Sequence, residues 1–286
     1  MSRPKASWGF TEGDAIVPGR HAVRLLGGGR RYEAYLAWDD DLRALVTVKV
    51  VRPDRVTHPP TLAGLAGEAR ALDALGHPGL VRAFDAVLEG ERPHLVLEFL
   101  DGPRLSTFIR REVVSIEQIL SLALELSSVI HHIGRRGWVH LDIKPRNVIM
   151  AGPPRLIDLS VARPVGEARR DAGGGSIGTE GYMAPEQRDP ARAGEIGPAV
   201  DVWALGATVY ELVAKRRAGD GSPAALPRRT PPALAAAVLA CLEPRPRDRP
   251  SAAALADQLE PLVDALPRPR LGIFRPGGRR RSAPVT

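Results

Sequence analysis

The chain has 286 residues, enough for one two-lobed domain or two small ones. Apolar residues make up 44% and charged residues 26%, the balance of a water-soluble globular protein, and no apolar run approaches the roughly 18 residues of a membrane helix. A single cysteine excludes an internal disulfide, and no apolar signal core follows the first residues, so we expect a cytoplasmic location.

The formal charge of +7 is concentrated near the C-terminal end of the sequence. Residues 267–286 hold six arginines and no acid, which predicts a basic, disordered tail and leaves the rest of the chain nearly neutral. Nucleic-acid binding by the folded part is therefore not expected.

Residues 1–15 mix Pro, Gly and both polarities without a period, which predicts an irregular extension. A strand at 22–26, a run of glycines and a strand at 32–38 follow. Because glycine leaves the backbone unobstructed, Gly27 and Gly29 could bring amides close to phosphates. An ordinary hairpin turn explains the same glycines equally well.

A third strand at 45–51 contains Lys49, the only charge in its run. Taken alone, this residue is best interpreted as a lysine on a solvated face. The next segment, 63–75, shows helical spacing of its leucines and carries Glu68.

A hairpin at 81–88 and 92–100 comes next, and Asp101-Gly102-Pro103 breaks the pattern, which puts a lobe boundary after residue 100. Ser115 with Gln118 three residues on predicts a capping box at the start of a helix. An apolar stripe continues that helix through Ile119, Leu122, Ala123, Leu126, Val129, Ile130 and Ile133.

The most informative stretch, 139–149, is a polar loop between two short apolar segments. An extended turn can aim Asp142, Lys144 and Asn147 into one small volume. Such a group suits phosphoryl transfer, in which the protein mainly positions groups and neutralises charge. A chance cluster of solvated charges is the alternative interpretation.

A second hairpin follows the polar loop, and Asp158 ends its apolar second strand. Across this hairpin Asn147 and Asp158 can face the same ion, so the Asp158 carboxylate could chelate a magnesium ion that bridges phosphates.

The loop at 161–176 has no apolar period and is expected to be mobile and irregular. The remaining sequence predicts one buried helix at 201–212, no amphipathic helix at 216–230, and two further helices at 233–242 and 252–266.

In this order, the motifs resemble the eukaryotic-like (Hanks-type) bacterial Ser/Thr protein kinases over about residues 20–266. The resemblance implies an α+β fold with two lobes, a small β-rich N-lobe at 16–100 and a larger helical C-lobe at 101–266. The two lobes together would form one kinase domain, 16–266.

The resemblance also implies site residues. It assigns catalytic roles to Asp142, Lys144 and Thr179. It assigns metal binding to Asn147 and Asp158. The implied ATP-binding residues are Gly27, Gly29, Lys49, Glu68, and the hinge residues Glu98 and Leu100, with Leu97 beside the back pocket.

Other positions receive structural roles by the same resemblance. Thr179 would bond the catalytic loop near Asp142 and Lys144, and Asp201 would tie down the backbone of that loop. Glu186 would form a buried pair with Arg249.

The implied activity is transfer of the γ-phosphoryl group of ATP, with Mg²⁺ or Mn²⁺, to Ser or Thr of protein substrates, with autophosphorylation. Arg279-Arg280-Arg281-Ser282 is a candidate acceptor context, although a solvated tail is the simpler interpretation. Lys144 and the segment 179–186 argue against a small-molecule kinase, because in the resembled family they serve a peptide acceptor.

The sequence departs from the family pattern in three motifs. Tyr32 stands at the third glycine of the glycine-rich loop, Leu159-Ser160 replaces the Phe-Gly after the metal-binding aspartate, and Leu141 replaces the arginine before the catalytic aspartate. Tyr32 and Ser160 keep open an alternative, a nucleotide-binding regulator with little turnover.

Overall fold

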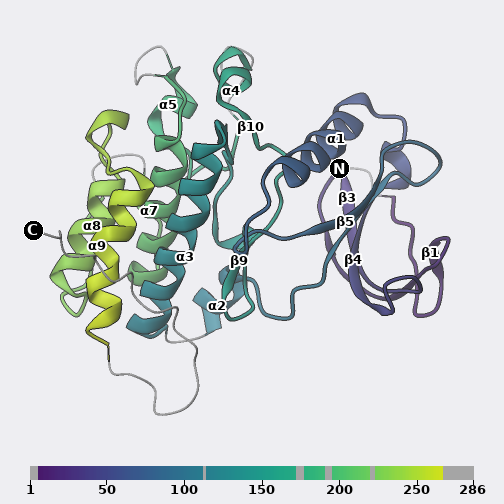
Figure 1. Cartoon of the computed structure of the whole chain (residues 1–286), viewed down its shortest axis with the longest axis horizontal. Helices are drawn as coiled ribbons and strands as arrows, with labels where there is room; N and C mark the ends of the chain where they lie inside the picture. The colour runs from purple at the N-terminus through teal and green to yellow at the C-terminus, as the bar shows by residue number, and fades with distance from the viewer. Residues whose placement is uncertain (1–5, 112–113, 172–176, 191–194, 220–222, 267–286) are drawn as a thin grey trace, which may run out of the picture.

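The computed structural model describes residues 6–111, 114–171, 177–190, 195–219 and 223–266, which form two lobes (Figure 1). The described part of the N-terminal lobe holds an antiparallel sheet in the order β1–β2–β3–β4–β6–β5. Its strands are β1 (Ala15–Val17), β2 (Arg20–Gly28), β3 (Tyr32–Asp39), β4 (Ala44–Val51), β5 (Ala83–Val87) and β6 (His94–Glu98).

Alternation along β4 gives the sheet two different faces. Val46, Val48 and Val50 are fully buried on one face, where Trp8 and Phe10 pack against them. Lys49 points to the opposite face because successive side chains of a strand alternate. Residues 6–14 contain no helix or strand, yet through these two rings they cover the outer face of the sheet.

Helices make up most of the C-terminal lobe, whereas α1 (Pro59–Ala74), preceded by η1 (Pro53–Arg55), belongs to the N-terminal lobe (Figure 1). In the C-terminal lobe α3 packs against α7 and α9, and α7 packs against α8. The helices there are α2 (Leu105–Arg111), α3 (Ile116–Arg135), η2 (Pro145–Asn147), α4 (Val165–Asp171), α5 (Pro185–Arg188), α7 (Ala199–Ala214), α8 (Pro232–Cys241), η3 (Pro246–Asp248) and α9 (Ala252–Asp264).

Short strands complete the C-terminal lobe around the polar loop. They form the pairs β7 (Trp138–Val139) with β10 (Arg163–Pro164) and β8 (Val148–Met150) with β9 (Pro154–Leu156). The polar loop therefore lies between β7 and β8, as the sequence predicts.

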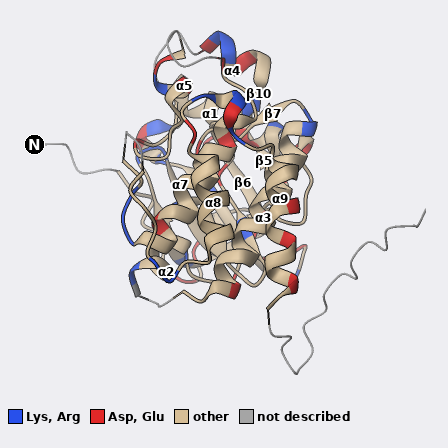
Figure 2. Ribbon diagram, turned by 90° about the vertical axis from the view of Figure 1, so that its left-hand side faces the viewer, with Lys and Arg blue, Asp and Glu red and all other residues tan. Residues whose placement is uncertain are grey.

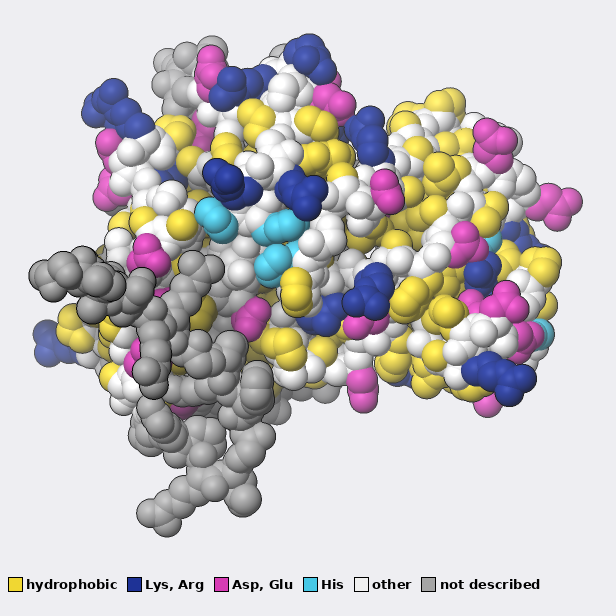
Figure 3. Space-filling view, viewed as in Figure 1, with side chains coloured by type: hydrophobic (Ala, Val, Ile, Leu, Met, Phe, Trp, Pro, Cys, Tyr) yellow, Lys and Arg dark blue, Asp and Glu magenta, His cyan; other side chains and the backbone are white. Residues whose placement is uncertain are grey.

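The lobes contact each other where the chain leaves α1. The amide of Val81 donates to the carbonyl of Leu156 at 3.0 Å. The ring of His77 lies 5.1 Å from that of His132 on α3. Histidine side chains also gather on the face of the molecule seen in Figure 3. Burial lowers the pKa of both imidazoles, so the two rings pack as neutral groups.

The predicted capping box is present at the start of α3. The Ser115 hydroxyl accepts from the Gln118 amide at 3.3 Å, and the Ser115 amide donates to the Gln118 side chain at 2.9 Å. This reciprocal pair satisfies two backbone donors of the first turn, which explains why the sequence located the helix start correctly.

Other element predictions need correction. β2 runs through Gly28, so two of the three glycines lie in the strand, and the turn begins at Gly29. α1 begins at Pro59 because prolines suit the first helical positions, where no amide partner is needed. β9 ends at Leu156, and Asp158 follows in a left-handed conformation at φ 66°.

The prediction that residues 161–176 are irregular throughout is wrong, because β10 and α4 lie within them. The sequence also gave no signal for α2. In α4 only Ala168 is buried, so the helix has no apolar stripe. Glu167 lies 3.0 Å from Arg70 Nη2 on α1, and Figure 2 shows basic and acidic residues side by side around α4.

The described residues between α7 and α8 contain no helix, as predicted for 216–230. No helix among the described residues is long and apolar enough to cross a bilayer. Ser176 and the tail at 267–286, with Ser282, lie outside the described residues.

Candidate active site

Asp201, in the first turn of α7, holds the start of the polar loop. Its carboxylate accepts hydrogen bonds from the backbone amides of His140 at 2.7 Å and Leu141 at 2.9 Å. Burial raises the pKa of Asp201, and His140 and the two amides counteract that shift. The loop is thus anchored to a helix in the protein core, as the resemblance implied.

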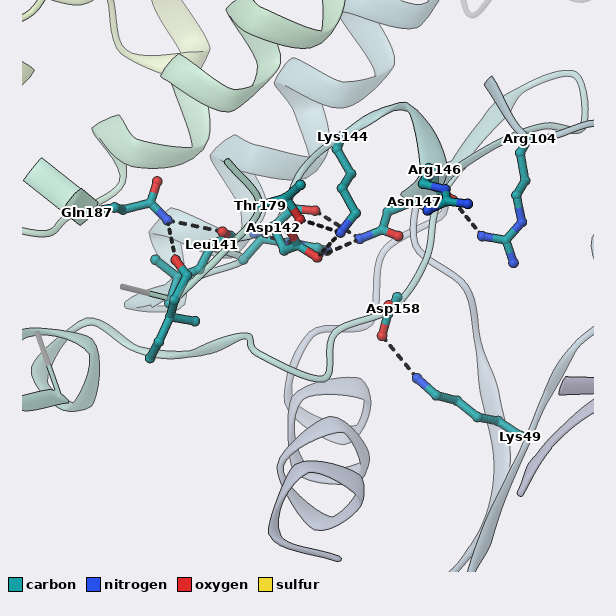
Figure 4. A network of polar contacts seen from close by, with 12 residues as sticks. Lys49, Arg104, Leu141, Asp142, Lys144, Arg146, Asn147, Asp158, Thr179 and Gln187 are labelled. Carbon is teal, nitrogen blue, oxygen red and sulfur yellow. Dashed lines mark hydrogen bonds and ion pairs between the residues drawn. The ribbon is translucent and has the colours of Figure 1, made fainter. Parts of the chain in front are cut away.

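Three side chains meet in the middle of the loop (Figure 4). Lys144 Nζ lies 2.6 Å from both Asp142 Oδ2 and Thr179 Oγ1, and the Thr179 hydroxyl donates to Asp142 Oδ1 at 2.6 Å. A carboxylate that can accept a proton is therefore held between an ammonium group and a hydroxyl. The implied contact of Thr179 with the catalytic loop is present.

Asn147 closes the same network from the end of the loop. Its amide nitrogen donates to the Asp142 backbone carbonyl at 2.9 Å and to Asp142 Oδ2 at 3.1 Å. Both hydrogen bonds of the Asn147 side-chain nitrogen are thus made to Asp142. The side-chain amide oxygen of Asn147 remains available to bind a ligand.

Lys49 joins the two lobes electrostatically. Its Nζ lies 2.6 Å from Glu68 Oε2 on α1 and 3.0 Å from Asp158 Oδ1 after β9. Burial alone would lower the pKa of Lys49, but the Asp158 and Glu68 carboxylates outweigh burial and raise it. The interpretation of Lys49 as a lysine on a solvated face is therefore wrong, because its side chain is only 13% exposed.

Asp158 is held in the charged form. Burial would raise its pKa, but the charge and hydrogen bond of Lys49, with a smaller contribution from Ser160, lower it. Leu159 is fully buried in the core, so leucine fills the apolar position next to Asp158. The backbone of Ser160 is not left-handed, so this position does not need glycine in the observed conformation.

The donor set fits a magnesium ion that is shared with phosphates. Asp158 offers a carboxylate and Asn147 an amide oxygen, the hard oxygen ligands that Mg²⁺ uses beside substrate phosphates. The described residues contain no group of three or more His, Cys, Asp or Glu that could hold a metal without a substrate.

The glycine-rich turn leaves room beside its backbone. At Gly27 and Gly29 no atom lies within 4 Å of the position that a Cβ would occupy. Gly28 is different, because a Cβ there would lie 3.0 Å from the Arg52 side chain. The open positions are the two predicted to approach phosphates.

The predicted hinge follows β6. The Glu98 side chain is bound to Arg155 at 2.5 Å, and its amide donates to the Arg82 carbonyl at 2.8 Å. Among the described residues, no hydrogen-bond partner is found for the Leu100 backbone. Leu100 thus keeps a donor and an acceptor free for a ligand such as a base edge.

The buried pair of Glu186 and Arg249 is present and bidentate. Arg249 Nη1 and Nη2 lie 2.6 and 2.9 Å from the two carboxylate oxygens, and both side chains have no exposed surface. The fork geometry makes this contact strong and fixes α5 against the residue that follows η3.

Sequence reasoning missed Gln187, which links the segment 177–187 to the polar loop. Its side-chain nitrogen donates to the carbonyls of Leu141 and Ile177, both at 3.1 Å, and its oxygen accepts from the Ala184 amide at 3.0 Å. Its place in the first turn of a helix that opens with proline was the available signal.

Comparison with known proteins agrees with this geometry. The family described as "Protein kinase domain" matches residues 20–258. The chain is 30% identical over 217 residues to serine/threonine-protein kinase PknA of Mycobacterium tuberculosis, covering 72% of this chain and 50% of that protein.

Two further relatives have similar names. Serine/threonine-protein kinase PrkC of Bacillus subtilis is 28% identical over 73% of this chain and 32% of its own length. Serine/threonine-protein kinase Pkn1 of Myxococcus xanthus is 29% identical over 90% of this chain and 40% of its own length. The chain thus spans half or less of the length of these relatives. The two-lobed fold, the ordered motifs and the match over most of its length establish that the chain belongs to the protein kinase family, as a relative of the bacterial Hanks-type Ser/Thr kinases.

Proposed function

We propose that the chain transfers the γ-phosphoryl group of ATP to Ser or Thr hydroxyls of protein substrates. The observation that carries the proposal is the network of Asp142, Lys144 and Thr179, with each pair of side chains 2.6 Å apart. The relatives, which are named serine/threonine-protein kinases, support Ser/Thr as the acceptor class. We further propose that residues 16–266 act as one kinase domain.

Asp142 would orient the acceptor hydroxyl and take its proton as the bond to phosphorus forms. Lys144, bound to the same carboxylate, would neutralise charge on the moving phosphoryl group. Thr179 would hold these two side chains in register with the acceptor segment.

Lys49 would bind the phosphates of ATP, and Glu68 would fix its position from α1. Gly27 and Gly29 would bring backbone amides to the phosphates, and the backbone of Glu98 and Leu100 would bind the adenine edge. These contacts would position the nucleotide before reaction.

Asp158 and Asn147 would hold the divalent cation, Mg²⁺ or Mn²⁺. When bound, the cation neutralises phosphate charge and so favours transfer. Because the pKa of Asp158 is lowered, its carboxylate is ready to act as a ligand at neutral pH.

The test uses purified protein, labelled ATP with Mg²⁺ or Mn²⁺, and a Ser/Thr peptide. We expect incorporation by the wild type and a loss of about a hundredfold or more in Asp142→Asn, because the proton acceptor is removed. Equal incorporation by both proteins would overturn the mechanism. If neither protein incorporates phosphate but both bind ATP, the chain is instead a nucleotide-binding regulator.

A further inference from the structure

Two arginines lie together at the end of the catalytic loop, beyond the proposed machinery. Arg146 is the residue before Asn147, and its side chain is exposed. Arg104 Nη1 donates to the backbone carbonyl of Arg146 at 2.7 Å (Figure 4). In Figure 4 both lie on the side of Asn147 away from Thr179. We call Arg104 and Arg146 the arginine pair.

The position of the arginine pair is built into the fold. The Met150 amide donates to the Pro103 carbonyl at 2.9 Å, and Arg104 forms a β-bridge with Ile149. Gly102 touches the same strand so closely that a Cβ would lie 2.5 Å from the Met150 carbonyl. The backbone before α2 is therefore fixed against β8, and it presents Arg104 beside the catalytic loop.

The arginine pair differs from Arg155 and Arg249, whose charges are neutralised by carboxylates. Arg155 pairs with Glu98 at 2.5 Å, and Arg249 pairs with Glu186 at 2.6 Å. Neither Arg104 nor Arg146 has a carboxylate partner within ion-pair distance among the described residues.

Holding two positively charged guanidinium groups close together is electrostatically unfavourable. Burial lowers the pKa of Arg104, the Asp158 charge opposes that shift, and the charge of Arg146 adds to it. A bound anion would relieve this repulsion. The guanidinium fork matches a carboxylate in geometry as well as charge.

We propose that the arginine pair binds acidic side chains of the protein substrate, so that this kinase prefers Ser or Thr acceptors flanked by Asp or Glu. This inference rests on the proposed function and names its substrate class. The proton acceptor Asp142 lies four residues before Arg146, so an extended peptide with its hydroxyl at Asp142 passes the arginine pair within a few residues.

One consequence concerns the tail of the chain itself. In the tail, Ser282 follows three arginines, and like charges would repel such a segment from the arginine pair. A peptide with the sequence of residues 277–286 therefore serves as the basic arm of the test, and we expect it to be a poor acceptor.

The experiment compares kcat/KM for matched peptides with one Ser and, on either side of it, two Glu, two Gln or two Arg. For the wild type we expect the better Glu peptide to exceed its Gln counterpart by about tenfold, the effect of two charge-assisted contacts. In Arg146→Gln and in Arg104→Gln/Arg146→Gln this ratio should fall towards one. In Arg104→Glu/Arg146→Glu the Arg peptides should become the better substrates.

Arg247→Gln is the matched control. It removes one arginine from η3, where the side chain is 77% exposed, so the Glu/Gln ratio should stay at the wild-type value. If the ratio in Arg104→Gln/Arg146→Gln equals that of the wild type, the proposal is overturned. It is also overturned if the variants raise KM for ATP equally with every peptide, because the arginine pair would then serve the nucleotide.

A binding measurement separates this proposal from the proposed function. Fluorescence anisotropy of the labelled Glu peptide, with Asp142→Asn protein and a non-hydrolysable ATP analogue, needs no turnover. Weaker binding in Arg146→Gln, with a smaller dependence on salt, supports the proposal even if no phosphate is transferred. If Asp142→Asn protein that retains both Arg104 and Arg146 binds the Glu and Gln peptides equally, the proposal is contradicted.

Discussion

Tyr32 links the sheet of the N-terminal lobe to α1 at the position where kinases of this family carry a third glycine. Its hydroxyl donates to the Thr61 carbonyl at 2.7 Å, and Lys49 Nζ lies 4.8 Å from its ring centre. Burial raises the pKa of Tyr32 to about 12, so the phenol remains a donor at neutral pH. Since α1 also carries Glu68, the tyrosine stiffens the unit that holds Lys49.

Two glycines of α1 test this contact. A Cβ at Gly64 would lie 2.8 Å from the Tyr32 hydroxyl, whereas a Cβ at Gly67 would meet nothing within 4 Å. We expect Gly67→Ala to raise the free energy of unfolding by about 1 kcal/mol through helix propensity. Gly64→Ala should give none of this gain, because Tyr32 must move and lose its hydrogen bond.

Urea unfolding of Gly64→Ala in wild-type and Tyr32→Gly backgrounds measures the coupling. Without the tyrosine, Gly64→Ala should recover the stabilisation of about 1 kcal/mol seen at Gly67. Equal stabilisation by the two alanines in the wild-type background would show that Tyr32 does not constrain α1.

At the scale of whole elements, the sequence predicted the helices and strands that have a clear apolar pattern or a capping motif. Ser115 marked the start of α3, and the apolar and β-branched run at 45–51 marked β4. α4 escaped prediction because Ala168 is its only buried residue. α2 is not predicted either, because Asp101-Gly102-Pro103 indicates only a boundary between lobes. The first residue of α2, Leu105, is nevertheless fully buried.

The packing of residues 6–14 could not be predicted either, since it depends on a side chain far along the sequence. Arg52 Nη1 donates to the Ala6 carbonyl at 2.7 Å, and Arg52 Nε donates to the Gly29 carbonyl at 2.9 Å. The same guanidinium lies 3.0 Å from Glu33, which is only 1% exposed. Arg52 thus connects the N-terminal segment to the glycine-rich turn.

We expect Arg52→Met to lower the free energy of unfolding by about 3 kcal/mol, because it leaves a buried carboxylate without its cation. Arg52→Met/Glu33→Gln should recover much of that loss. Urea unfolding measures both variants, with Arg24→Met, an exposed arginine of β2, as control. A loss as small as that of the control would mean that the Arg52 contacts contribute little.

At the scale of the whole molecule, the family resemblance implied the contacts of Thr179, Asp201 and Glu186, which are present, but not every contact between distant residues. Lys49 and Asp158 are 109 residues apart in the sequence, and Arg104 and Arg146 are 42 apart. No local period carries information over such separations. Neither contact is encoded in a motif, and both appeared only in the fold.

Leu141 bears on how the proposed kinase activity is controlled. Family members that are switched by loop phosphorylation usually carry arginine here, which pairs with the added phosphate. In this chain the Leu141 side chain is buried in the core, and its carbonyl accepts from Gln187. The position therefore offers no cation to a phosphate, while Thr179 is already bound to Asp142 and Lys144.

The last prediction is that activity does not depend on phosphorylation of Ser176, the remaining candidate acceptor in this segment. Because no cation lies at position 141, phosphate on Ser176 would gain little there, and control would arise from expression level or partners. Initial rates on one peptide should be similar for wild type, Ser176→Ala and phosphatase-treated enzyme. Thr179→Ala should be much slower, because it removes two contacts of the catalytic network. A tenfold drop in Ser176→Ala, roughly 1.4 kcal/mol, would show phosphorylation control through a cation elsewhere.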